Sequence, residues 1–421
     1  MNAKPRVVKF SGGRSSGMML LNLLKDGELD PKRGDVIVFN NTSAEHSETY
    51  EFTRRFKKIA EDDYGIPFFW TEFQSYEDSN SNNVWVRNPS YRLVNDKPFS
   101  KENPDGYKFK GEVFEEMISL NGYMPNMMNR SCTAAMKITV TNNFLSDWFA
   151  MKDGIDRKGH FGKASRMRDK DIIELHKRRG GGVPDDILLS KREYIRTCSH
   201  YRPEQKWEDF TKGQIVVNNP VLKNSIFGDA AELHGDNCVE YISCLGFRAD
   251  EKRRLHKVKD RIETAADEGR KSFSTQPWGE EAYAPLIEKG ITQEDVNEFW
   301  SKQNFDLNLP QDGLFSNCLF CPLKGSAKLL KIAYETQKNE DESSPESIDW
   351  WINIEKKYSR DLKAEKRKLS NKDKNTNYVG FFGGKETHVF QDIKDKVEKI
   401  DINNIDPSML NIDSVPCNCT D

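Results

Sequence analysis

The stretch that decides the fold lies near the start of the chain and reads Arg6-Val7-Val8-Lys9-Phe10-Ser11-Gly12-Gly13-Arg14-Ser15-Ser16-Gly17. The apolar run over residues 6–10 predicts a β-strand, and the apolar residues 18–21 predict a helix that begins directly after the Gly/Ser segment. Backbone N–H groups at a helix N-terminus point outward with the positive end of the helix dipole. The glycines let the backbone approach a ligand without an intervening Cβ atom. We therefore predict a phosphate-binding loop over residues 11–17.

This loop matches neither of the two common nucleotide-binding signatures. It has no Gly-Lys-Ser/Thr, as a Walker A loop does, and it is not a dinucleotide fingerprint of the GxGxxG type. Taken alone, the segment is also compatible with an ordinary tight turn between a strand and a helix.

The following residues predict an α/β fold. Residues 35–39 form a second apolar run without an internal charge, as in a parallel strand buried on both faces, and residues 67–70 read as a third strand. Between them lie a polar loop over residues 40–50 and a helix with Phe52, Phe56 and Ile59 at helical spacing. This order predicts a doubly wound, mostly parallel sheet. Ligands bind such sheets at the carboxyl ends of the strands, where both polar loops are expected.

Four short motifs in colinear order resemble a known family. The loop over 11–17 is similar to the S-G-G-x-[DS]-S loop of the PP-loop ATP pyrophosphatases, and residues 41–50 resemble N-T-G-x-E-x-P-E-T-Y. Residues 129–138 resemble R-x-C-T-x-x-x-K-[IV], and residues 245–254 resemble G-[IF]-R-A-D-E-S-x-R-R, with Lys252 in place of Ser. On these motifs the chain resembles the PAPS (phosphoadenosine phosphosulfate) reductase-like family, which includes the DNA phosphorothioation sulfurtransferase branch. The matches cover residues 6–330.

The resemblance implies an adenine-nucleotide site that takes ATP, or PAPS or APS. The phosphates would lie on residues 11–17, and the adenine would lie near the end of the second strand. Arg248 and Lys137 would neutralise charge on the phosphates or on a sulfate. The acidic residue that helps to hold Mg²⁺ in ATP-splitting members is Ser15 here, so Asp250 or Glu48 would supply a carboxylate instead. The expected cofactor-binding residues are Ser11, Gly12, Gly13, Arg14, Ser15, Ser16, Phe39, Asn41 and Thr42.

Three classes of function follow from the resemblance. The first is an ATP-dependent enzyme that forms AMP and pyrophosphate and activates an acceptor for sulfur transfer. The second is a thiol-dependent reductase of PAPS or APS, and the third is a nucleotide-binding regulatory or defence component without turnover. The intact double-glycine loop favours the first class over the second.

The cysteines predict metal or thiol chemistry. Cys318 and Cys321 form a C-x-x-C pair, which suits zinc, an iron–sulfur cluster or a redox dithiol. Together with Cys132 and Cys244 they would hold a [4Fe–4S] cluster, as in some members of the family. Structural zinc on the same four thiolates is the alternative, and Cys198 and Cys238 compete with Cys244. Cys417 and Cys419 lie in the C-terminal tail as redox thiols or as an exposed end.

Composition and segment boundaries complete the sequence-based expectations. The net charge is −3 and no apolar run is long enough to span a membrane, so we expect a cytoplasmic protein. Basic residues at 157–170 and 363–368 are candidates for nucleic-acid contact, or are solvated helix faces, and a sulfur-donor protein is a further expected partner. The expected units are an α/β domain over 1–254, a smaller cysteine-bearing unit over 255–330 and a helical, basic extension over 331–421. The first unit would contain an insertion at 73–118 and a basic segment at 152–182.

Overall fold

We describe a computed structural model of the 421-residue chain. The residues it describes are 4–79, 85–121, 124–126, 130–149, 155–156, 170, 173–174, 185, 204–213, 241–267, 280–316, 318–337, 339, 341–361, 378–382 and 389–399.

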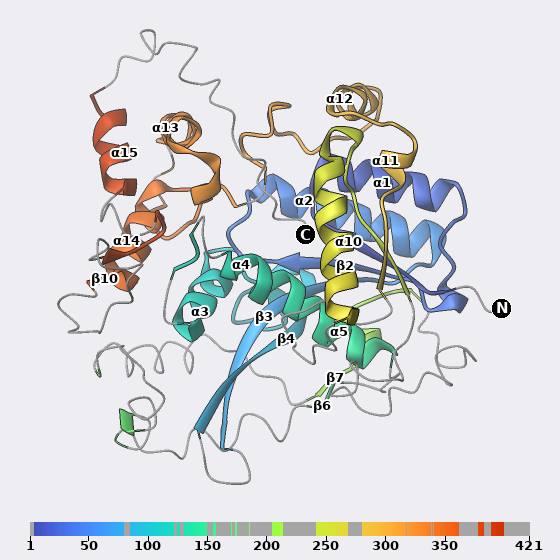
Figure 1. The fold of residues 1–421 in the computed structure, drawn as a ribbon, viewed down its shortest axis with the longest axis horizontal. Helices are drawn as coiled ribbons and strands as arrows, with labels where there is room; N and C mark the ends of the chain where they lie inside the picture. The colour runs from blue at the N-terminus through green and yellow to red at the C-terminus, as the bar shows by residue number, and fades with distance from the viewer. Residues whose placement is uncertain are drawn as a thin grey trace.

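A seven-stranded, mostly parallel sheet forms the centre of the described part (Figure 1). Its order is β5 (Gly106–Tyr107), β4 (Trp85–Pro98), β3 (Phe68–Ser79), β2 (Val36–Asn41), β1 (Arg6–Phe10), β8 (Tyr241–Cys244) and β9 (Glu280–Tyr283). The only antiparallel pairing within it is between β3 and β4. The predicted α/β sheet is thus confirmed, including the strands expected at 6–10, 35–39 and 67–70.

Helices cover both faces of this sheet. On one face lie α1 (Arg14–Lys25) and α2 (Ser47–Lys58), with α12 (Gln293–Ser301) packed on α1. On the other face lie α3 (Glu112–Asn121), α4 (Ser131–Thr133), the π-helical turn η3 (Ala134–Thr139) and α5 (Val140–Phe149). Helix α10 (Lys252–Asp267) connects β8 to β9, and the short helix α11 (Pro285–Glu288) follows β9.

Successive side chains of β3 point to opposite faces of the sheet, and each face is packed with apolar residues. Phe68 points to the α2 face, where its ring lies 5.5 Å from that of Phe10. Phe69 points to the α5 face, where it lies 5.4 Å from Phe144 and 5.6 Å from Trp148. Because both faces are covered there, β3 begins with three large apolar residues in succession, Phe68–Trp70.

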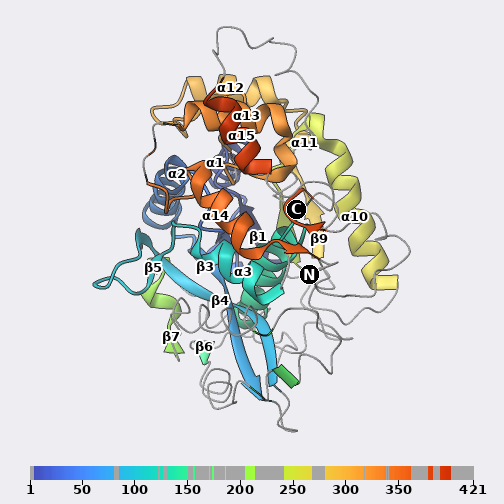
Figure 2. The same ribbon diagram turned by 90° about the vertical axis from the view of Figure 1, so that its left-hand side faces the viewer.

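The sheet contains more strands than the sequence predicted, among them β4, β5 and β9. Residues 73–118, expected to be partly loop-like, contain the ends of a long β3–β4 hairpin, strand β5 and helix α3. Figure 2 shows this hairpin projecting away from α12 and α13 (Ser326–Glu335). Residues 74–79 of β3 are mostly polar in the sequence, which hides this part of the strand from an argument based on apolar runs. Strand β9 belongs to the same sheet, so the sheet continues past residue 254.

The C-terminal helices pack around one aromatic cluster. Helix α14 (Ile348–Tyr358) contacts α3 and α15 (Val389–Val397), and α15 also contacts α13. Trp351 lies at the centre, 5.4 Å from Phe114 of α3 and 5.7 Å from Phe390 of α15. Phe320, from the C-x-x-C loop, lies 6.3 Å from the same indole. This cluster therefore joins the C-terminal helices, the cysteine loop and the α/β core.

Two small antiparallel ladders lie outside the main sheet. They are β6 (Ile155–Asp156) with β7 (Glu204–Gln205), and β10 (Arg360–Asp361) with β11 (Tyr378–Val379). None of the helices in the described ranges is long and apolar enough to cross a membrane.

Candidate nucleotide-binding site

The predicted phosphate loop lies where the chain changes direction across the sheet. From β1 the chain runs to β2 on one side, and β8 is the neighbour of β1 on the other side. The carboxyl ends of β1 and β8 therefore flank a topological switch point, where α/β sheets commonly bind ligands. Ser11 follows β1 and Leu245 follows β8, so the first and the fourth of the family-like motifs meet at this edge.

The loop has the backbone geometry of an anion site. Gly12 has φ +77°, and Gly13 is the N-cap of α1 without a side-chain hydrogen bond to the first turn. No acidic residue occurs in that first turn. Ser16 Oγ instead accepts from Ser11 Oγ at 3.0 Å and donates to the Gly13 carbonyl at 2.8 Å, which fixes the loop. The first N–H groups of α1 are thus not capped by a side chain and favour a negatively charged ligand.

Arg248 reaches this loop from the β8 side. Its Nη1 donates to Ser15 Oγ at 3.1 Å, while its Nε and Nη2 donate to the two carboxylate oxygens of Asp250 at 3.1 and 2.9 Å. Gly246 makes this approach possible, because a Cβ atom there would lie 2.9 Å from Ser16 Cα. The guanidinium therefore lies beside the N-terminus of α1.

A cavity of about 310 Å³ opens between these two loops. Its basic lining residues outnumber its acidic ones, which are Glu251 and Asp312. Six basic side chains line it: Lys9, Arg14, Arg248, Arg254, Lys324 and Lys328. An excess of positive charge beside a helix N-terminus suits a phosphate-bearing ligand.

Residues 307–316 form the side of the cavity that the sequence did not reveal. Arg14 holds them in place, because its Nε and Nη2 donate to both carboxylate oxygens of Asp306, at 2.8 and 2.6 Å. The same guanidinium donates to the carbonyls of Leu309 and Pro310. Arg14, predicted as a cofactor-binding residue, thus lines the cavity and also anchors its wall.

The residues expected to hold the adenine lie at the end of β2. Phe39 is buried in the sheet, and the Asn41 amide donates to Glu72 Oε1 at 2.8 Å and to the Lys108 carbonyl at 2.7 Å. Asn41 Oδ1 also accepts from the Ser43 N–H, which supports the positive φ of 59° at Ser43. Thr42 Oγ1 lies 3.0 Å from Glu45 Oε1. None of these three predicted residues lines the 310 Å³ cavity.

The other expected catalytic residues are more scattered. Lys137 lies in η3 and does not line the cavity. Asp250 holds Arg248, and Glu48 at the start of α2 accepts from Asn308 Nδ2 at 3.1 Å. Neither carboxylate lines the cavity, and the two carboxylates that do are engaged with basic residues.

Three of the four predicted metal-binding cysteines share a small cavity. Cys132, Cys318 and Cys321 line a space of about 20 Å³ together with Arg130 and Trp351. The described residues contain no group of three or more His, Cys, Asp or Glu side chains that is already positioned around a metal ion. The structure thus brings three candidate thiols to one cavity without a preformed set of metal ligands.

Cys244 is placed elsewhere. It lies in β8, in register with Val8 and Tyr283, and is not among the residues that line the small cavity. Burial raises the pKa of its thiol to about 12, so it is protonated at neutral pH. The competing Cys198 and Cys238, the tail residues Cys417 and Cys419, and the basic stretches at 157–168 and 363–368 lie outside the described residues.

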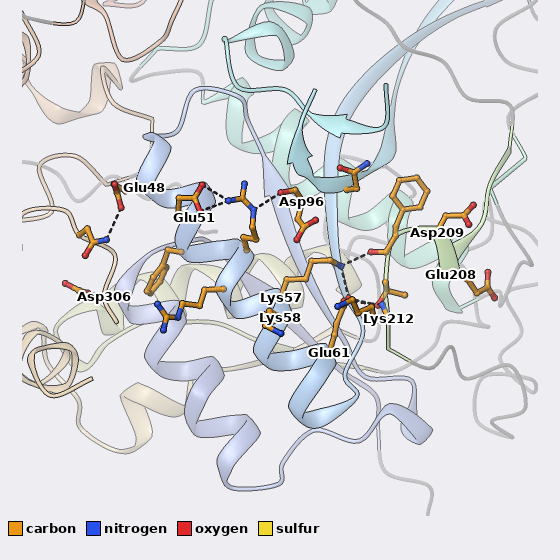
Figure 3. Close-up of a pocket in the computed structure, with 17 residues that line it drawn as sticks. Glu48, Glu51, Lys57, Lys58, Glu61, Asp96, Glu208, Asp209, Lys212 and Asp306 are labelled. Carbon is orange, nitrogen blue, oxygen red and sulfur yellow. Dashed lines mark hydrogen bonds and ion pairs between the residues drawn. The ribbon is translucent and has the colours of Figure 1, made fainter. Parts of the chain in front are cut away.

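A larger cavity of about 750 Å³ lies on the outer side of α2 (Figure 3). Its lining contains more acidic than basic residues, and several of these pair with each other. Lys57 Nζ donates to Glu61 Oε1 at 2.7 Å and to two backbone carbonyls, and Arg54 pairs with Glu51. This distribution of charge disfavours a phosphate, so the smaller cavity is the better candidate for an anionic ligand.

Sequence reasoning missed several residues of the smaller cavity. Lys324 and Lys328 come from the cysteine loop and helix α13, and Gln293 comes from α12. A pattern of apolar residues or a local motif cannot reveal them, because only tertiary packing brings these distant residues to the same cavity as the loop. Lys324 follows Cys321 by three residues in the sequence. That spacing gives no sign that Lys324 lines the cavity beside the predicted phosphate loop.

Comparisons of this chain with protein-family models, with curated proteins and with solved structures found no match.

Proposed function

We propose that the protein binds an adenine nucleotide at the 310 Å³ cavity and uses it in PP-loop chemistry of the PAPS reductase-like kind. One observation carries this proposal: Arg248 Nη1 lies 3.1 Å from Ser15 Oγ, at the open N-terminus of α1 and at a switch point of the sheet. Two motifs separated by more than 200 residues in the sequence thereby form one anion site.

The reaction that we propose is transfer of an adenylyl group. An acceptor oxygen attacks the α-phosphorus of ATP, a bond between that oxygen and the phosphorus forms, and the bond to the leaving pyrophosphate breaks. Negative charge grows on the leaving pyrophosphate. The N–H groups of residues 13–16 and the guanidinium of Arg248 lie where they would stabilise that charge. The adenylated acceptor would then be open to attack by a sulfur nucleophile.

The cysteine cavity fits an accessory role in this proposal. Cys132, Cys318 and Cys321 offer thiolate ligands that suit an iron–sulfur cluster or zinc, and a fourth ligand would have to come from another part of the chain. Such a cluster would supply electron-transfer or structural support beside the nucleotide site. Thr42 Oγ1 lies 3.5 Å from Cys318 Sγ, which places the cysteine loop against the end of β2.

The test is to incubate the purified protein with ATP labelled in the α- or the γ-phosphate and to identify the products. Release of AMP and pyrophosphate, in the presence of a sulfur donor and candidate acceptors, is the expected result. Release of ADP and phosphate would refute adenylyl chemistry. Binding of ATP without any turnover under all conditions would favour the nucleotide-binding regulatory component instead.

A further inference from the structure

The 310 Å³ cavity is lined by two kinds of surface. The phosphate loop and Arg248 supply serine, glycine and basic residues, and residues 307–316 form a second wall. Among the described residues that line the cavity, the large apolar side chains all belong to this second wall: Leu307, Leu309, Pro310 and Leu314. A nucleotide has the same division, since its phosphates are charged whereas its base is a flat ring that suits apolar surface.

The start of the second wall contributes to two cavities. Leu307 and Leu309 line the 310 Å³ cavity, whereas Asp306 and Asn308 line the larger cavity of about 750 Å³. Both leucines are buried and belong to the hydrophobic core, which fixes their side chains. This segment therefore offers apolar side chains to the candidate nucleotide site and polar side chains to the neighbouring cavity.

Two polar contacts fasten this segment to the α/β core. Arg14 Nε and Nη2 donate to the two carboxylate oxygens of Asp306, at 2.8 and 2.6 Å, and Arg14 Nη1 donates to the Pro310 carbonyl at 3.2 Å. Glu48 of α2 accepts from Asn308 Nδ2 at 3.1 Å (Figure 3). Only 9% of the Arg14 side chain and 29% of the Asp306 side chain are exposed, so solvent screens their ion pair less than it screens a fully exposed one.

The donors of Arg14 are thus directed at the second wall. Its Nε, Nη1 and Nη2 each donate to a residue between 306 and 310, although Arg14 itself belongs to the phosphate loop. One guanidinium therefore sets the position of the apolar wall relative to the N-terminus of α1. Asp306 fixes the orientation of that guanidinium with two hydrogen bonds.

We infer that residues 307–314 receive the nucleoside part of the nucleotide while its phosphates lie on residues 11–17, and that Asp306 is the positioning residue of this wall. The residues at the end of β2, which the sequence analysis assigned to the adenine, do not line the cavity, whereas the wall does. This inference rests on the proposed nucleotide site and adds to it the surface that recognises the base.

The test compares ATP with inorganic tripolyphosphate, which has the phosphates but no nucleoside, by calorimetry on the full chain. Asp306→Asn keeps the size of the side chain and removes the charge that holds Arg14. It should weaken ATP binding about 10-fold, while tripolyphosphate binding changes less than about 2-fold. The matched control is Glu298→Gln, because Glu298 also pairs with a basic residue, Lys302, and lines neither cavity. This control should bind both ligands as the unchanged protein does.

A double variant shows whether Asp306 acts through Arg14. Arg14→Lys should also weaken ATP binding, and combining it with Asp306→Asn should weaken ATP binding no more than about 2-fold beyond the more affected single variant, because both changes break one ion pair. Thermal unfolding shows that each variant is folded.

The outcomes separate this inference from the proposed function. Selective loss of ATP affinity in Asp306→Asn, with losses that do not add in the double variant, supports the inference. Equal losses for ATP and tripolyphosphate, unchanged ATP binding, or fully additive losses would overturn it while leaving the proposed site in place. Failure of the unchanged protein to bind ATP would overturn the proposed function and this inference together.

Discussion

Gly12 and Gly13 are neighbours in one loop, yet alanine substitution should affect the protein in two different ways. Gly12 has φ +77°, and a Cβ atom there would lie 2.6 Å from Thr49 Cγ2 and 3.3 Å from the Phe39 ring. Gly13 has φ −97° and ψ 163°, which alanine adopts readily, and its added Cβ would meet only Ser11 Oγ, at 3.7 Å. The first substitution therefore strains the folded protein, whereas the second projects a methyl group into the cavity.

The magnitudes follow from these contacts. The left-handed backbone of Gly12→Ala costs about 1–2 kcal/mol of folding free energy, and the clash with Thr49 adds about 1–3 kcal/mol. Gly13→Ala should cost about 1 kcal/mol or less of folding free energy, as a change at a helix N-cap. It should weaken ATP binding about 10-fold or more, equivalent to about 1.4 kcal/mol, because the methyl group displaces a phosphate oxygen from the N–H groups of the loop.

The assay combines urea unfolding with calorimetric titration of ATP for both variants. The expected pattern is a large loss of stability in Gly12→Ala, and a loss of affinity with near-normal stability in Gly13→Ala. Gly27→Ala serves as the control, because Gly27 also has positive φ but its Cβ would meet no atom within 4 Å and it lies outside the cavity. Unchanged ATP affinity in a folded Gly13→Ala protein would refute the assignment of residues 11–17 as the phosphate loop.

Three further substitutions test other parts of the structure. Arg248→Lys should reduce turnover about 10-fold or more, because an ammonium group cannot hold Asp250 with two hydrogen bonds and also reach the phosphate loop; near-normal turnover would make Arg248 a structural residue. Burial raises the pKa of Glu355, between α14 and α15, from 4.5 to about 7, so the folded state prefers the protonated carboxyl. The free energy of unfolding should therefore fall as pH rises from about 4.5 to about 7, by up to about 3 kcal/mol. Glu355→Gln should remove that fall in urea titrations at pH 4.5 and 8, and an unchanged pH dependence would contradict the prediction. Cys318→Ser should abolish bound iron or zinc, measured by elemental analysis of anaerobically purified protein, whereas Cys244→Ser should retain it; equal loss in both variants would return Cys244 to the ligand set.

Local sequence determined the first three strands of the chain because the signals for them are short-range. The apolar runs at 6–10, 35–39 and 67–70 are strands in the structure, and the polar segments after the first two lie at the carboxyl edge of the sheet. Ser11 to Gly17 could be predicted as a helix-opening loop because strand, glycines and helix are contiguous. For Arg248, only the family-like motif suggested a place near that loop, and the structure has its Nη1 3.1 Å from Ser15 Oγ.

Only the tertiary structure decided which distant residues complete the site. Arg14 pairs with Asp306, and Lys324 and Lys328 line the same cavity as the loop, through tertiary contacts such as that of α12 with α1, which no local pattern encodes. The cysteines show the same limit. Spacing within Cys318–Cys321 indicated a pair, but the path of the chain brings Cys132 to that pair and leaves Cys244 inside a strand. Gly12 and Gly13 also look alike in the sequence. Only the packing of Thr49 and Phe39 against Gly12 shows that the fold requires a glycine there, whereas Gly13 has room for a Cβ atom and would be required by the ligand.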